Sequence, residues 1–206
     1  MSRYKTQRIA PILLAIVIII VAVAGLVALG RLLFSGVTRS NTSVTQSESI
    51  ISTTRDDLLK TTDGRAISMA VRGPIVADED FRSYRITISP SSRNFEAFTG
   101  YLESSTSNQS LSNNTAAYNQ FVNALDKARL VNSAPTDSET ADLLGICATG
   151  KVYEFNILNN GSSTALYWTS TCSGSKGNLS ANVGQVSSLF FSQIPDGSDI
   201  ESNLSL

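Results

Sequence analysis

The sequence predicts an α+β protein, with an N-terminal transmembrane helix and a small domain of about five antiparallel strands with two helices on one face. Three observations lead to this prediction. Residues 9–30 form an apolar run without a charge. Residues 63–195 contain segments with the two-residue period of strands and others with the 3.6-residue period of helices. Cys147 and Cys172 lie on either side of an Asn-Asn-Gly turn at 159–161, which is typical of a hairpin.

Residues 9–30 are long enough to cross a membrane as a helix. At ~1.5 Å per residue they extend about 33 Å, and a hydrocarbon core is ~30 Å thick. Residues 1–8 carry basic side chains and no acidic one, which is typical of a cytoplasmic flank. We therefore expect a cell-membrane protein with a cytoplasmic tip at 1–8 and an extracytoplasmic body. A cleaved signal and a secreted protein are the alternative, because 28–30 resembles a cleavage site, although the apolar run exceeds the usual ~7–15 residues.

Residues 31–62 are predicted to form a polar stalk, since they are rich in Ser, Thr, Gln and Asn. Val44, Ile51 and Leu58 recur at intervals of seven, so residues 47–60 are a candidate short helix within this stalk. A loosely ordered spacer is the alternative. A self-associating coil would need about three or four heptads, more than this segment contains.

The first half of the domain is predicted to contain strands, a polar loop and a helix. The strands are expected at 65–72, 83–90 and 95–102, the last two as an antiparallel hairpin. Residues 103–112 are polar and are expected to form a loop. The helix begins at a cap on Asn113 or Asn114 and runs to about Leu130, with apolar side chains at helical spacing on one side.

The second half repeats this order of elements. Strands are expected at 151–158 and 165–172, followed by a helix capped by Ser180, with a polar tail at 196–206. With an offset of 69 residues, Tyr84 aligns with Tyr153 and Phe121 with Phe190. The repetition predicts a duplicated ββα unit whose two copies share one core.

Cys147 and Cys172 are predicted to form a disulfide. The midpoint between them falls on the Asn-Asn-Gly turn, which would place them opposite each other across the hairpin. Such a bridge is expected to stabilise the fold by roughly 3–4 kcal/mol. It also agrees with an oxidising compartment outside the cytoplasm. Two buried thiols are the alternative interpretation.

Composition argues against several functional classes. The chain has no histidine, which removes His-based catalytic triads and the commonest zinc ligand. The residues after Arg31 carry 12 basic and 17 acidic side chains, a net charge of about −5 that disfavours binding to nucleic acid. The acidic cluster at 78–80 lacks the spacing and the glycine of a calcium loop. We expect no metal and no cofactor.

The side of the sheet without helices is the candidate binding face. Alternation along the strands assigns Tyr167, Phe98, Arg85 and Glu154 to this face and places Trp168 in the core. Packing is the competing explanation for most of the aromatic rings. If a ligand binds the domain, the sequence points to this face.

These observations predict a non-enzymatic binding or structural module of the cell envelope. Its expected partners are the lipid bilayer, through residues 9–30, and an unidentified envelope protein or polymer. The alternative is an envelope hydrolase of the Ser-Lys type, the one hydrolytic arrangement open to a chain without histidine. Its base would be Lys127 or Lys151, although the helical spacing places Lys127 in solvent.

Overall fold

The computed structural model describes residues 41–138, 141–197 and 199–200. The chain divides into two units, 1–46 and 47–206, and the sheet lies in the second. The predicted membrane span at 9–30 and the cytoplasmic tip before it lie outside the described residues. None of the described helices combines the length and the apolar composition that a membrane crossing requires.

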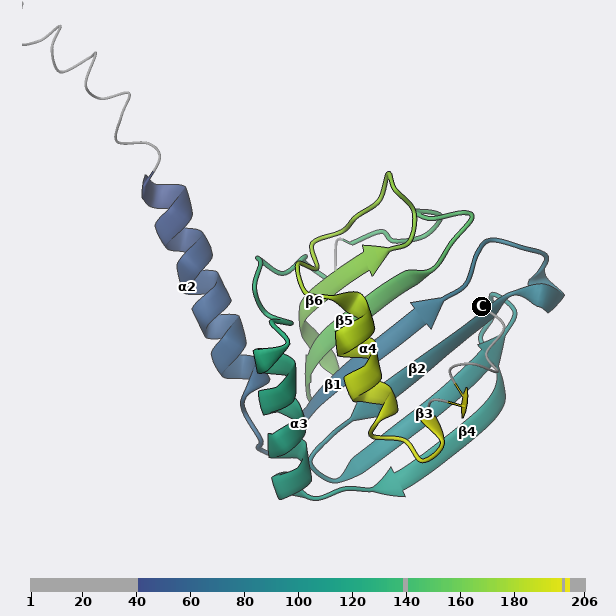
Figure 1. Cartoon of the computed structure of the whole chain (residues 1–206), viewed down its shortest axis with the longest axis horizontal. Helices are drawn as coiled ribbons and strands as arrows, with labels where there is room; N and C mark the ends of the chain where they lie inside the picture. The colour runs from purple at the N-terminus through teal and green to yellow at the C-terminus, as the bar shows by residue number, and fades with distance from the viewer. Residues whose placement is uncertain (1–40, 139–140, 198, 201–206) are drawn as a thin grey trace, which may run out of the picture. The chain divides into compact units, whose positions relative to one another are not determined.

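The second unit is an α+β domain built on a six-stranded antiparallel sheet with the order β4-β3-β2-β1-β5-β6 (Figure 1). Along the chain, the elements are α2 (Asn41–Leu58), β1 (Arg65–Arg72), the short 3-10 helix η1 (Asp78–Asp80), β2 (Arg82–Ile88), β3 (Ser92–Thr99), β4 (Ser104–Ser112), α3 (Thr115–Lys127), β5 (Val152–Asn159), β6 (Ser162–Ser170) and α4 (Val183–Phe191). The predicted class and the two hairpins, β2–β3 and β5–β6, are confirmed.

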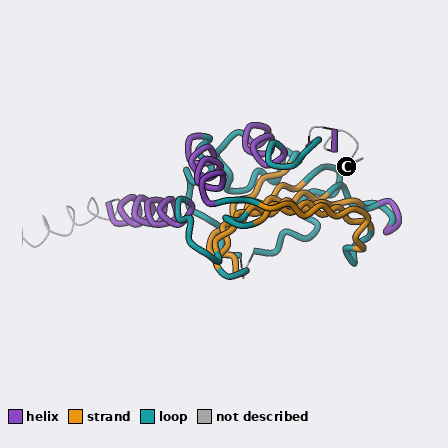
Figure 2. Tube along the Cα trace, turned by 90° about the horizontal axis from the view of Figure 1, so that it is seen from below, coloured by secondary structure: helices purple, strands orange, loops and turns teal. Residues whose placement is uncertain are grey.

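Helices α3 and α4 cover one face of the sheet, which we call the helix-covered face (Figure 2). The side chain of Asn114 caps α3 by accepting the backbone N–H of Ala117, as expected. The predicted cap of α4 at Ser180 is wrong, because Asn182 performs this role by accepting from Gln185. The reason is tertiary: the backbone N–H of Leu179 donates to the carbonyl of Trp168, which holds this part of the chain against β6.

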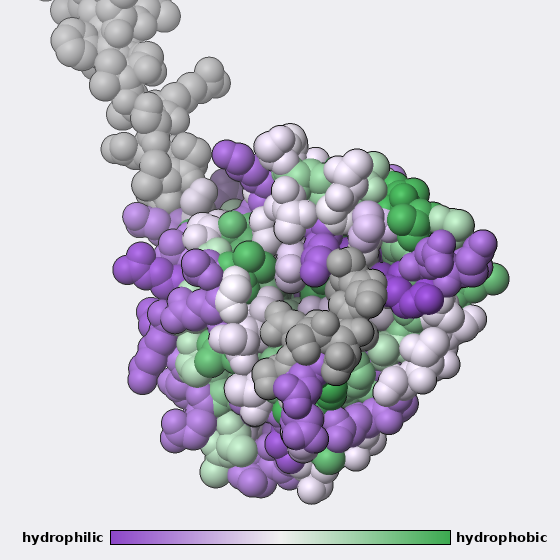
Figure 3. Space-filling view, turned by 45° about the vertical axis from the view of Figure 1, so that its right-hand side comes forward, coloured by the Kyte–Doolittle hydropathy of each residue, from purple (hydrophilic) through white to green (hydrophobic). Residues whose placement is uncertain are grey.

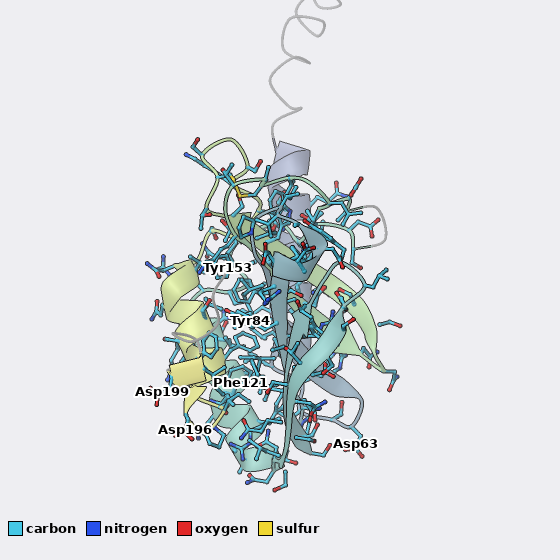
Figure 4. All side chains as sticks on the ribbon, turned by 90° about the vertical axis from the view of Figure 1, so that its right-hand side faces the viewer. Asp63, Tyr84, Phe121, Tyr153, Asp196 and Asp199 are labelled. Carbon is cyan, nitrogen blue, oxygen red and sulfur yellow. A yellow bond between two sulfur atoms is a disulfide. The ribbon has the colours of Figure 1, made fainter. Side chains whose placement is uncertain are left out.

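The core lies between the helices and the sheet. Phe121 of α3 meets Phe190 of α4 edge-on, with ring centroids 5.1 Å apart, and Phe190 also contacts Phe155 of β5. Figure 4 shows Tyr84, Phe121 and Tyr153 in this layer. Leu58, which the sequence placed in the polar stalk, is fully buried in the core, so the end of α2 packs with the domain.

The loop predicted at 103–112 is wrong, because most of this segment forms the edge strand β4. Its nine residues include only one large apolar side chain, Leu111, so the alternation that marks a half-buried strand is absent. Main-chain pairing with β3 holds it in the sheet instead. The sheet therefore has six strands rather than about five.

The β3–β4 and β5–β6 ladders each contain a β-bulge at a threonine. In β4, Thr106 is the extra residue, and in β6 it is Thr164. Each threonine hydroxyl donates to a carbonyl of the neighbouring strand, at 3.1 Å from Ala97 and 3.1 Å from Ile157 respectively. A bulge adds one residue to one strand, so all side chains beyond it change face relative to a regular ladder.

The predicted duplicated ββα unit is wrong. Strands β2 and β5 both pair antiparallel with β1, one on each side, so they run in the same direction. Their hairpin partners β3 and β6 lie on the outer sides, and the helices cover the same face. The two halves are therefore arranged as mirror images about β1. Two copies of a repeat must superpose by rotation. Two arrangements of opposite handedness do not, so the halves cannot superpose as repeats.

The predicted disulfide between Cys147 and Cys172 is confirmed, with a Cα–Cα distance of 5.5 Å. It does not lie across the β5–β6 ladder as expected, because the last ladder pair is Val152 with Ser170. The bulge and the turn register displace the two cysteines from direct opposition. The bridge instead joins the loop before β5 to the turn after β6. Gly150 packs beside the bridge, since a Cβ there would lie 2.1 Å from the Thr171 hydroxyl and 3.0 Å from the Cys147 sulfur.

Candidate functional site: a cleft on the open face

The face of the sheet opposite α3 and α4, which we call the open face, holds a cavity of about 500 Å³. One wall is the sheet itself, and the other includes residues 141–144, which we call the roof segment. The side chains that carry its chemistry are Arg72, Ser83, Arg85, Phe98, Glu103 and Glu154. Three of the four residues predicted for the binding face, Phe98, Arg85 and Glu154, therefore lie together in this cleft.

Arg72, the last residue of β1, lines the cleft. One terminal nitrogen of its guanidinium donates to the Glu154 carboxylate at 2.5 Å and to the Leu143 carbonyl of the roof segment at 3.3 Å. The side chains of Arg72 and Glu154 are 24% and 20% exposed, so this ion pair is largely screened from water. The Nε of Arg72 is buried and has no hydrogen-bond partner.

Ser83 of β2 lies directly opposite Arg72 in the ladder between β1 and β2. Its residue is 5% exposed, and its hydroxyl is buried without a hydrogen-bond partner. Buried polar groups in folded proteins are nearly always hydrogen-bonded, and an unpaired one costs about 1–3 kcal/mol. Two neighbouring strands thus contribute two unpaired polar groups, Arg72 Nε and Ser83 Oγ, from paired residues that line the cleft.

Arg85 and Phe98 form the side of the cleft nearer to β4. The Arg85 guanidinium lies 5.5 Å from the centre of the Phe98 ring, a cation–π distance. Glu103 approaches the same guanidinium at 3.5 Å. Phe98 is only 8% exposed, so the arginine covers the aromatic face that the sequence had suggested as a binding platform.

The placement of Tyr167 on the open face is wrong. Tyr167 pairs with Phe155 on the helix-covered face, is fully buried, and donates its hydroxyl to the Ser133 carbonyl at 3.3 Å. Trp168, predicted to be core, pairs with Glu154 and therefore faces the open side. The cause is the bulge at Thr164, which exchanges the two faces of β6. Alternation alone contains no signal for that extra residue.

The roof segment is anchored on both sides. Before it, the backbone N–H of Thr136 donates to the Leu166 carbonyl on the outer edge of β6. After it, Cys147 is bonded to Cys172. Between these anchors Leu143 is buried in the cleft at 8% exposure, whereas Leu144 is 79% exposed. The disulfide thus holds the chain that covers the candidate site.

A second, more apolar hollow of about 320 Å³ adjoins the cleft. Both are lined by Arg72, Leu143 and Leu144, and the hollow is extended by Phe81, Tyr101 and other apolar residues. Large hydrophobic side chains are exposed around this end of the sheet, namely Ile75, Val76, Tyr101, Leu102 and Leu144. Figure 3 shows hydrophobic surface beside strongly hydrophilic residues on the side of the molecule that it brings forward.

The acidic cluster at 78–80 lies in η1, outside the cleft. Asp78 accepts the backbone N–H of Tyr101 at 2.8 Å and so ties η1 to the turn after β3. Within the described ranges, no three acidic or cysteine side chains are grouped as metal ligands would be. Lys127 is exposed at the end of α3, so it lacks the desolvation that would make a lysine a base.

Comparisons with protein-family models, with curated proteins and with solved structures found no match to this chain.

Proposed function

We propose that this protein is a membrane-anchored, non-enzymatic binding module whose cleft on the open face captures an envelope component outside the cytoplasm. The observation that carries the proposal is the cleft itself, a cavity of about 500 Å³ that contains both charged pairs and unpaired buried polar groups. Concave sites with a few convergent polar groups are the usual form of ligand pockets. The apolar run at 9–30 supports the anchor, and the disulfide supports an oxidising compartment.

Site-specific photo-crosslinking of the full-length protein in its own host cells tests this function. A benzoylphenylalanine replaces Leu144, which lies at the rim of the cleft and is 79% exposed. The matched control carries the same group at Asn123, which is exposed on α3. We expect discrete adducts from position 144 that are absent from position 123. Equal adducts from both positions, or none from position 144, would contradict the proposal.

The membrane anchor has a separate test, the mass of the mature N-terminus. A chain that retains residues 1–30 and stays in the membrane fraction agrees with an anchor. A mature chain that begins just after position 30 would show a cleaved signal, and the module would then be secreted. This result would change the location of the module without altering the cleft.

A further inference from the structure

We propose that the ligand of the cleft is an uncharged, extended peptide segment of a partner protein. One main-chain carbonyl of this peptide accepts hydrogen bonds from Arg72 Nε and Ser83 Oγ, and one large apolar side chain enters the neighbouring hollow. The inference depends on the proposed binding function and specifies its ligand chemistry.

The unpaired groups call for a hydrogen-bond acceptor. The N–H of an arginine Nε can only donate a hydrogen bond. A serine hydroxyl can also donate, so both groups can bond to the same acceptor. Arg72 and Ser83 are direct neighbours across the ladder between β1 and β2, and both groups are buried without a partner. One oxygen within hydrogen-bond distance of both groups would satisfy them together. Ser83 is 5% exposed, so its hydroxyl is shielded from bulk solvent.

The charges of the cleft favour a neutral acceptor over a carboxylate. Arg72 is paired with Glu154, and Arg85 with Glu103. Asp142 also lines the cavity, so the side chains named here carry two positive and three negative formal charges. A ligand carboxylate would add a further negative charge to a partly desolvated site, which is unfavourable. An amide carbonyl avoids this cost.

The roof segment already shows how a peptide fits this site. The Leu143 carbonyl accepts from the Arg72 guanidinium, and the Leu143 side chain is buried at 8% exposure. One short stretch of the chain's own backbone thus combines a carbonyl on Arg72 with an apolar side chain. The adjoining hollow of about 320 Å³ offers a second apolar position, lined by Phe81 and Tyr101.

A polysaccharide fits the same cleft less well. Sugars are commonly held by stacking on an exposed aromatic face, and the aromatic residues that line this cleft, Phe98 and Tyr84, are 8% and 4% exposed. Tyr101 of the adjoining hollow is 46% exposed, but its ring is stacked on Phe81. A sugar chain would also bury many hydroxyls, each requiring a partner. The apolar hollow provides few such partners, whereas a peptide side chain fills it with apolar surface.

Selection from a random octapeptide display library, on the full-length protein in lipid nanodiscs, tests the inference. The variants are Ser83→Ala and the matched control Ser187→Ala. Both serines are at most 5% exposed and both have an unpaired hydroxyl, but Ser187 lies on α4. Arg72→Lys is a second cleft variant, which keeps the positive charge facing Glu154 and removes Nε. Thermal unfolding of each variant verifies that it is folded.

We expect enrichment of uncharged peptides that contain a large apolar residue. The best of them should bind Ser83→Ala and Arg72→Lys about tenfold more weakly than wild type, the effect of one lost hydrogen bond. Binding to Ser187→Ala should stay unchanged. Peptides that bind Ser83→Ala as tightly as wild type would place the peptide site elsewhere and overturn the inference. Enrichment of acidic peptides would overturn the neutral-acceptor argument.

A parallel titration with chitohexaose separates this inference from the proposed function. Binding of the sugar that weakens in Ser83→Ala, without peptide enrichment, would overturn the peptide assignment and keep the binding module. Absence of both peptide and sugar binding would overturn the peptide assignment, and the crosslinks from position 144 would then decide the proposed function by themselves.

Discussion

The two faces of the sheet are built from alternate residues of the same strands, yet their chemistry differs sharply. The helix-covered face is an apolar layer in which Phe121, Phe155 and Phe190 meet. The open face carries the pair Arg72–Glu154 and the unpaired hydroxyl of Ser83. The period of two lets a strand stabilise the fold with one set of side chains while the other set is available for recognition. Variants on each face should therefore affect stability and binding to different extents.

Tyr167→Asp should have the largest effect. Tyr167 pairs with Phe155 on the helix-covered face and is fully buried, so an aspartate there would place an unpaired charge in the apolar layer. We expect a loss of more than about 5 kcal/mol in the free energy of unfolding. Urea unfolding followed by Trp168 fluorescence measures it. Near-wild-type stability would show that position 167 does not belong to the apolar layer.

Phe190→Ala should have the second-largest effect on stability, since this ring joins α4 to both α3 and β5. Truncation of a buried phenylalanine leaves a cavity and costs about 3–5 kcal/mol. The control is Leu102→Ala, because Leu102 is 92% exposed and its truncation should stay within about 0.5 kcal/mol of wild type. Denaturant unfolding of both variants compares them. Equal losses would mean that the helix-covered face is not the source of stability.

The double variant Cys147→Ser, Cys172→Ser should cost about 3 kcal/mol. The bridge closes a segment with a sequence separation of 25, and opening it restores chain entropy to the unfolded state. Unlike the core truncation, it should also release the roof segment, so limited proteolysis near residues 141–144 should accelerate before global unfolding. Unaltered proteolysis at these residues would contradict the role of the disulfide in holding the open face covered.

Alkaline pH should weaken the helix-covered face in particular. Burial raises the pKa of Tyr118 from 10.0 to about 12, and burial likewise raises the pKa of Tyr167 to about 12. Because the folded state favours the neutral phenols, their contribution is complete below pH 10 and is lost as pH rises from 10 to 12. We expect a decrease of at most about 3 kcal/mol per tyrosine. Tyr118→Phe should reduce this pH dependence when unfolding is measured between pH 9 and 12.

Glu154→Gln should have the smallest effect on stability, a loss of about 1–2 kcal/mol. The substitution removes the charge of a largely buried ion pair with Arg72, but the amide oxygen still accepts a hydrogen bond. Its ligand binding should change more than its thermal unfolding, since the pair lies in the cleft. Ser187→Ala is the reference for a silent substitution. A loss as large as that of Phe190→Ala would show that the open face is a second stabilising core.

Local sequence patterns were sufficient for the elements with strong chemical signatures. The alternation of Ile67, Met69 and Val71 predicted β1, and the side chain of Asn114 predicted the start of α3. The same patterns could not reveal β4, because an edge strand held by main-chain hydrogen bonds needs no apolar side chains. Three residues of the candidate face, Arg85, Phe98 and Glu154, were assigned to it correctly from alternation.

The sequence by itself determined which residues alternate, which turn the chain and which cysteines can pair, since these properties depend on neighbours along the chain. Only the tertiary structure decided that Thr164 bulges out of β6, so that Tyr167 faces the core, and that Ser83 lies beside Arg72 in the cleft. Strand register causes this difference. A shift of one residue exchanges every side chain between the two faces, and the register depends on hydrogen bonds between strands that the linear sequence does not display.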